Sequence, residues 1–310
     1  MFPSGSGQQM TRGEIEKTVQ PIIFECLRKF GEYARPGISP EEYAEEIKTQ
    51  LRPDVRRASL IISLAKSATG EEFDGEGREL GCGYGYLIFS MAKFYPKMRW
   101  TGIEHPGRIY FNNPEYRQAF QDCHCSLMGL DFVHEPLPFA DQSLSVVTFS
   151  ETLEHLPVQR VNFVLAEISR VLRPDGILIA SSPNQASLEN RLHLLRGRSV
   201  FDLPDEMEIA HGVFSHIRLY TPSEIKFMMS RLGFRVECSA MESNNSTYRG
   251  KSALSMYRRM YRLYEGVEQR LGFLRTPGFL CFARTAGAIG EERKPIVQLG
   301  EFVIQAEVLQ

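Results

Sequence analysis

The stretch Glu79-Leu80-Gly81-Cys82-Gly83-Tyr84-Gly85 decides the fold. Its three glycines stand at alternate positions, directly before the apolar helical run YLIFSMAKFY (86–95), an order that indicates a tight turn from a strand into a helix. Glycine is needed where the backbone bends sharply and lets a ligand come close. Ligands of open α/β sheets bind beside such turns, at the carboxyl ends of the strands. The stretch therefore predicts a ligand site.

Short apolar runs alternate with helical segments after this turn. The segment 158–172 repeats apolar side chains with the period of a helix, while the runs around it are too short for helices. Alternation of this kind predicts an α/β fold, with a mainly parallel sheet covered by helices on both faces. The runs that we expect to form strands cover residues 98–104, 125–131, 143–150, 176–182, 234–240 and 277–285.

The regions outside this alternation define the expected domain organisation. Residues 1–70 combine a Gly/Ser/Gln-rich, disordered start with a helical cap, in which Pro40 begins a second helix, capped by Ser39, and a third helix follows Pro53. Residues 71–285 form the main domain, with inserts at about 184–220 and 241–276, and residues 286–310 form a C-terminal tail.

Acidic residues at the strand ends indicate which ligand binds. A dinucleotide fingerprint would place a third glycine at Tyr86, and the chain has no phosphate-binding P-loop sequence. Glu104 ends the next strand, where a carboxylate accepts hydrogen bonds from ribose hydroxyls, and Asp131 ends the one after it, within reach of an adenine amino group. Glu79 is placed to receive the amino group of an amino acid. Together these groups describe S-adenosylmethionine.

Four ordered blocks resemble class I, Rossmann-like methyltransferases that use S-adenosylmethionine. They are ELGCGYG, GIE, LDFVHEPLPFADQSLSVVTFSETLEHLP and LAEISRVLRPDGILIASSPN, and LYTPSEIKFMMSRLGFRVE extends the resemblance to about residue 240. The resemblance implies a doubly wound, mostly parallel sheet with an antiparallel last strand, S-adenosylmethionine as cofactor and methyl transfer as activity. The cofactor contacts that it implies come from Glu79, Gly81, Gly83, Gly85, Glu104, Asp131, Phe132, Ser150 and Glu151.

Gly77 and Arg78 depart from the family pattern. They stand where the first strand normally has two apolar residues, so that strand is weakly encoded. This departure is the one feature that favours a non-catalytic binding protein with the same fold. A nicotinamide oxidoreductase is disfavoured by Tyr86.

Glu151 and His155 are the candidate catalytic residues. Four positions apart on a predicted short helix, they share one face, so that the carboxylate orients the imidazole as a general base. The alternative is that both shape the pocket, because relatives with different substrates share the pattern.

The acceptor side is expected to involve Tyr84, His211, His216 and Tyr220. The insert that holds the last three resembles inserts of bacterial small-molecule and glycan methyltransferases, which implies such an acceptor, with O-methylation as the reaction. A protein or RNA acceptor is the alternative. His211 and His216 have no cysteine or carboxylate partner at a metal-binding spacing, so we expect no metal.

Charge and cysteine content indicate the kind of partner and the cellular location that we expect. Thirty-six Lys and Arg residues face 38 Asp and Glu residues, a formal net charge of -2, which argues against nucleic acid as a partner. Residues 249–275 carry seven basic and two acidic side chains, which we interpret as a solvated helical face. The alternatives are contact with an acidic substrate, an anionic membrane surface or RNA. Six scattered cysteines and no apolar leader predict a reduced, cytoplasmic protein. The sequence does not define an oligomeric state.

Overall fold

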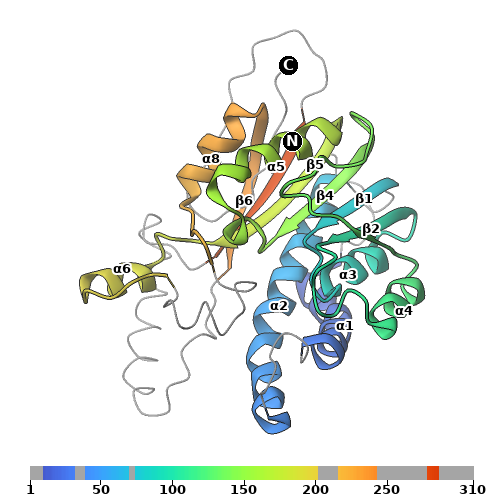
Figure 1. The fold of residues 1–310 in the computed structure, drawn as a ribbon, viewed down its shortest axis with the longest axis horizontal. Helices are drawn as coiled ribbons and strands as arrows, with labels where there is room; N and C mark the ends of the chain where they lie inside the picture. The colour runs from blue at the N-terminus through green and yellow to red at the C-terminus, as the bar shows by residue number, and fades with distance from the viewer. Residues whose placement is uncertain (1–9, 32–38, 70–73, 202–215, 243–277, 286–310) are drawn as a thin grey trace.

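The computed structural model describes residues 10–31, 39–69, 74–201, 216–242 and 278–285. Within them, seven strands form one sheet in the order β3-β2-β1-β4-β5-β7-β6 (Figure 1). The strands β1 to β5 are parallel, and β7 is antiparallel to both of its neighbours, so the predicted doubly wound sheet with an antiparallel last strand is confirmed. The strands are β1 (Gly75–Leu80), β2 (Met98–Glu104), β3 (Ser126–Gly129), β4 (Leu144–Ser150), β5 (Leu172–Pro183), β6 (Phe234–Glu242) and β7 (Gly278–Thr285).

Helices cover both faces of this sheet and bury a core on each. One core joins the helices α1 to α4 to side chains such as Trp100 and Val146, and the other joins α5 and α8 to side chains such as Val147 and Leu178. Val146 and Val147 point to opposite faces because side chains alternate along a strand. The helices are α1 (Arg12–Phe30), α2 (Pro40–Thr69), α3 (Tyr86–Phe94), α4 (Pro114–Asp122), α5 (Val158–Val171), α6 (Leu188–Leu195) and α8 (Pro222–Arg231), with a 3-10 turn, η2 (Leu153–His155).

The weakly encoded first strand is fully formed. Gly77 pairs with Trp100 of β2 and Val146 of β4, and a β-carbon at Gly77 would lie only 2.6 Å from the Trp100 ring. Arg78 is buried, with its guanidinium 2.9 Å from Glu76 and stacked over the ring of Phe139. The two residues that weaken the strand pattern thus have partners in the fold, and they no longer favour a non-catalytic protein.

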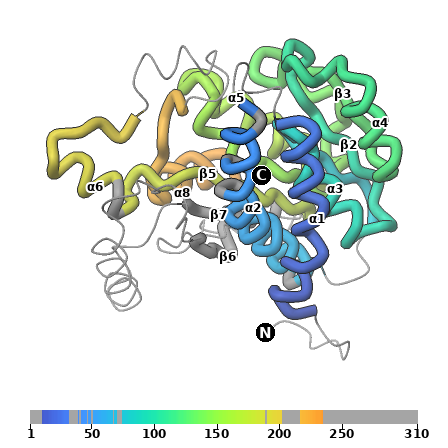
Figure 2. Tube along the Cα trace, turned by 90° about the horizontal axis from the view of Figure 1, so that it is seen from below, coloured from blue at the N-terminus to red at the C-terminus, as the bar shows by residue number. Residues whose placement is uncertain are grey.

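The predicted break at Pro53 is wrong, because α2 runs without interruption through it (Figure 2). Buried side chains lie on both sides of the proline, among them Ile47 and Ile61, and all pack into the same core beside α1. Packing of this continuous apolar stripe outweighs the cost of a proline inside a helix, about 3 kcal/mol. The predicted cap is present: Glu42 donates its backbone N–H to the Ser39 hydroxyl at 3.2 Å.

Several expected regions fall wholly or partly outside the described residues. The first insert contains α6, and an isolated bridge pairs Asn184 with Tyr220, while residues 202–215 are not described. The start that we expect to be disordered, most of the second insert with its basic segment, and the tail also lie outside the described residues. Among the helices that are described, none is both long and apolar enough to span a bilayer.

Candidate active site

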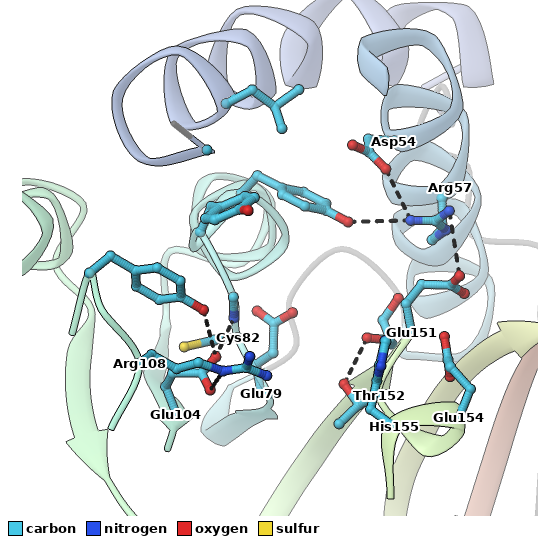
Figure 3. Close-up of a pocket in the computed structure, with 18 of the residues that line it drawn as sticks. Asp54, Arg57, Glu79, Cys82, Glu104, Arg108, Glu151, Thr152, Glu154 and His155 are labelled. Atoms are coloured by element: carbon cyan, nitrogen blue, oxygen red, sulfur yellow. Dashed lines mark hydrogen bonds and ion pairs between the residues drawn. The ribbon is translucent and has the colours of Figure 1, made fainter. Parts of the chain in front are cut away.

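A cavity of about 370 Å³ opens at the carboxyl ends of β1, β2 and β4. The glycine turn and the ends of these strands form its floor, and α1 and α2 cover it from the other side (Figure 3). Figure 3 shows Glu79 and Glu104 at one end of the cavity and Glu151, Glu154 and His155 at the other. A single hollow therefore joins two groups of polar side chains.

The glycine turn has the backbone conformation that its sequence predicts. Gly81, Gly83 and Gly85 have φ angles of 72°, 51° and 82°, which side-chain-bearing residues rarely adopt. A β-carbon at Gly81 would lie 2.6 Å from the Thr152 hydroxyl, whereas one at Gly83 would meet no atom within 4 Å. Gly81 and Gly83 line the cavity, so their backbone is open to a ligand there. Gly85 is the N-cap of α3 and is not among the lining residues.

Glu104 is buried at the end of β2 and accepts several hydrogen bonds. Its carboxylate takes the backbone N–H of Gly83 and of His105, both at 2.8 Å. The Arg108 guanidinium lies 3.3 Å away and the Tyr110 hydroxyl 3.4 Å away. These contacts fix the carboxylate beside the glycine turn, where ribose hydroxyls would reach it.

Glu79, at the end of β1, is also buried but has an oxygen without a hydrogen-bond partner among the described residues. It is 3% exposed and lines the cavity, yet its Oε2 has no hydrogen-bond partner among the described residues. Burial, with a contribution from the nearby Glu104, raises the pKa of Glu79 well above its usual range. A ligand ammonium group would supply the missing partner and favour the charged form. The unpaired Oε2 of Glu79 therefore fits the amino end of S-adenosylmethionine.

The end of β4 carries a chain of hydrogen bonds. The Ser150 and Ser181 hydroxyls are 2.6 Å apart, and Ser181 donates to the Glu151 carboxylate at 2.8 Å. Glu151 itself has a φ of 49°, which turns its side chain into the cavity. Arg57 of α2 faces it from across the cavity, with Nη2 3.6 Å from Oε2.

The predicted helical pairing of Glu151 and His155 is wrong. Residues Leu153–His155 form a single 3-10 turn and Glu151 precedes it in a left-handed conformation, so the spacing of an α-helix does not apply. Both side chains still line the cavity. The ring of His155 lies beside that of His216, with 5.1 Å between centroids.

Glu154 completes this group, and the sequence gives no sign of it. The ligand atoms of Glu154, His155 and His216 all lie within 4.8 Å of one another. Glu154 is 0% exposed, and among the described residues neither of its carboxylate oxygens has a hydrogen-bond partner. Burial, and then the charge of Glu151, raise the pKa of Glu154 well above its usual range. The sequence predicts no metal at His216 because these partners lie about 60 positions earlier in the chain, outside any metal-binding spacing.

Some predicted site residues do not reach the cavity. Asp131 lies outside the lining and pairs with His134 at 2.8 Å, and Phe132 is buried in the core. Tyr220 is 2% exposed and packs in the same core, because it pairs with Asn184 at the base of the insert. Tyr84 does line the cavity, and His211 falls outside the described residues.

The cap contributes lining residues that we did not predict. Asp54 and Arg57 of α2 are paired at 3.0 Å and largely buried. Burial is the main reason that the pKa of Asp54 rises to about 6. Tyr43 also lines the cavity and donates its hydroxyl to the Leu27 backbone oxygen. The sequence signal for this pair is an acidic and a basic residue, Asp54 and Arg57, three positions apart within an otherwise apolar stripe of the helix.

Comparison with known proteins points to one class. Residues 78–180 match the family model of a methyltransferase domain. The chain is 24% identical over 184 residues to the tRNA N(3)-methylcytidine methyltransferase Mettl2 of Drosophila melanogaster, covering 58% of this chain and 54% of that one. It is 26% identical over 221 residues to the malonyl-[acyl-carrier protein] O-methyltransferase of Hahella chejuensis, covering 67% and 74%. The chain thus spans about half the length of the Drosophila relative.

One solved structure has a similar fold over most of this chain. It is a complex of the Haloferax volcanii Trm112 methyltransferase activator with a chain described as a methyltransferase; the match is 15% identical, with a TM-score of 0.51, and covers 80% of this chain and 97% of that one. At that identity the likeness shows the fold alone.

The sheet is α/β and Rossmann-like, and the segment 78–180 within it matches a methyltransferase domain. The Drosophila and Hahella relatives are both named methyltransferases.

Proposed function

We propose that this protein transfers the methyl group of S-adenosylmethionine to a hydroxyl or carboxyl oxygen of a small-molecule or glycan acceptor. The observation that supports it is the continuous cavity. One end has the glycine turn with Glu79 and Glu104, and the other has Glu151 and His155. A cofactor at the first end would direct its methyl group toward an acceptor at the second.

Each end has a distinct task in this proposal. Bound S-adenosylmethionine supplies a methyl carbon that its sulfonium already activates. Glu79 would hold the amino group, and Glu104 the ribose hydroxyls, in place of some of its present donors. Positioning of the two reactants then provides most of the rate, since an acceptor oxygen attacks the methyl carbon in line. Glu151 and His155 would orient the acceptor. Asp131 and the Phe132 backbone stay proposed adenine contacts from the family resemblance.

The size and charge of the cavity support a small acceptor. The helices α1 and α2 close over it, and Arg57, its cation at the acceptor end, is already paired with Asp54 and faces Glu151. A phosphate-rich polymer would meet carboxylates there. We propose residues 71–285 as the catalytic domain, the preceding helices as its substrate-covering cap, and the cytoplasm as its location.

Transfer of a labelled methyl group tests the proposal. The purified chain is incubated with methyl-tritiated S-adenosylmethionine and, separately, with a pool of small hydroxylated and carboxylated metabolites, with oligosaccharides, with total tRNA and with protein. Label is expected in the metabolite or oligosaccharide fraction. The relative that acts on tRNA makes tRNA the second candidate, and label in the tRNA or protein fraction alone would overturn the proposed acceptor class.

A further inference from the structure

We propose that Glu154, His155 and His216 bind one divalent transition-metal ion at the acceptor end of the cavity. The three come from two distant parts of the chain: Glu154 and His155 from the 3-10 turn after β4, and His216 from the segment before α8. The fold itself ties these parts together, because Ile217 and Arg218 donate their backbone N–H groups to the Glu154 carbonyl at 2.8 and 3.2 Å.

The distances suit a shared ion. Metal–nitrogen and metal–oxygen bonds of about 2.0–2.2 Å place two ligands of one ion up to roughly 4.4 Å apart. The ligand atoms of the three residues lie within 4.8 Å of one another. Small side-chain rotations would therefore close the coordination sphere, without movement of the backbone.

The Glu154 carboxylate is the observation that indicates a ligand. It is completely buried, lines the cavity, and both of its oxygens are without a hydrogen-bond partner among the described residues. An unpaired buried carboxylate is costly. A cation would offset the charge, and it would satisfy both oxygens where the carboxylate binds it through both.

The donor set indicates the class of ion. Two imidazoles and one carboxylate suit Mn²⁺, Fe²⁺, Co²⁺ or Zn²⁺, whereas Mg²⁺ and Ca²⁺ prefer oxygen ligands throughout. Three protein ligands leave coordination positions open. Arg57 is the nearby cation, and its charge is offset by Asp54 and Glu151, so it does not exclude a metal ion.

The three ligands line the acceptor end of the cavity, and this part of the inference rests on the proposed function. An acceptor hydroxyl bound to the ion would have a lowered pKa and would release its proton to water. The oxygen electron pair would form the new C–O bond while the bond from the methyl carbon to sulfur breaks. His155 would act here as a metal ligand, a role that replaces that of general base.

Cobalt binding by the full-length chain tests the site. The chelator-treated protein is titrated with Co²⁺, followed by calorimetry and by visible absorption, which reports nitrogen and oxygen ligands. We expect one Co²⁺ per chain and visible bands, and in His216→Ala and Glu154→Gln a loss of affinity of roughly tenfold or more. His124→Asn is the matched control, because His124 is exposed at the amino end of β3, away from the cavity, and asparagine tolerates its φ of 54°.

Each outcome decides the proposal. Absence of Co²⁺ binding, or equal affinity in the wild type and both variants, would overturn it. Circular dichroism of each variant checks the fold, and the pair guards against a folding defect in one, since Glu154→Gln removes a buried charge while His216→Ala changes a segment outside the helices. Binding of S-adenosylhomocysteine is measured on the same samples. Binding of Co²⁺ without binding of S-adenosylhomocysteine would overturn the proposed function but support the metal site. Binding of S-adenosylhomocysteine without binding of Co²⁺ would overturn the metal site alone.

Discussion

The guanidinium of Arg57, on the second N-terminal helix, lies 3.6 Å from the carboxylate of Glu151 at the end of β4. The same guanidinium pairs with Asp54 at 3.0 Å and contacts the Tyr86 hydroxyl at 3.4 Å. One cation thus holds the cap, the glycine-turn helix and the end of β4 together over the cavity. The cap is therefore part of the site.

Arg57→Met tests this link. Methionine keeps the aliphatic stem but removes the cation, so the carboxylates of Asp54 and Glu151 lose the positive charge between them, while Glu151 keeps its hydrogen bond from Ser181. We expect the free energy of unfolding to fall by about 1–3 kcal/mol in urea denaturation. Arg28→Met, which removes an exposed ion pair with Glu25, is the control and should change it by less than about 1 kcal/mol. Equal losses in the two variants would show that Arg57 does not couple the cap to the sheet.

Asp54 makes stability depend on pH in a defined direction. Its pKa rises from 3.8 to about 6, mainly by burial and partly through Glu151, while Arg57 opposes the rise. An acid with a raised pKa in the folded state contributes stability below its unfolded pKa, and this contribution is lost as pH rises through the folded value. As pH rises from 4 to 6, the free energy of unfolding should therefore fall more in the wild type than in Asp54→Asn. Thermal unfolding across this range measures it, and parallel curves would contradict the assignment.

Glu104 is expected to affect both binding and stability. In Glu104→Gln an amide replaces a carboxylate whose two oxygens accept from Gly83 and His105. The amide keeps one acceptor oxygen, so one of these two backbone donors would face its NH2 group. Loss of hydrogen bonds to a charged acceptor, about 1.5–3 kcal/mol, corresponds to a roughly ten- to hundredfold weaker binding of S-adenosylhomocysteine. The melting temperature should also fall. Glu135→Gln, at an exposed position outside the cavity, should change neither, and unchanged affinity in Glu104→Gln would exclude a ribose contact.

We predict that the fold requires glycine at position 77 because of the neighbouring Trp100 ring. A methyl group there would lie 2.6 Å from the ring of the buried Trp100, so Gly77→Ala should destabilise the fold by about 1–3 kcal/mol through overpacking. Gly13→Ala is the matched control: no atom lies within 4 Å of its β-carbon, and alanine in a helix adds up to about 1 kcal/mol. Melting temperatures that move in the same direction for both variants would refute this explanation of the strand.

Local patterns explain what could be predicted from the sequence. The glycine turn and the strand at 98–104 depend on neighbouring residues, and their predicted bounds agree with the structure. The role of Gly77 depends on Trp100, 23 positions later, and α2 continues through Pro53 because of packing against α1. The group of Glu154, His155 and His216 forms only when two distant segments meet. No periodicity in the sequence reports such contacts.

Calorimetric titration of the wild-type chain with S-adenosylhomocysteine, beside NAD, tests the cofactor site most directly. Glu79 with its unpaired Oε2, the fixed Glu104 and the open backbone of Gly81 and Gly83 all line one cavity. We therefore predict one S-adenosylhomocysteine site per chain without added metal, and an affinity that falls in Glu79→Gln. No binding of S-adenosylhomocysteine, or tighter binding of NAD, would contradict the account.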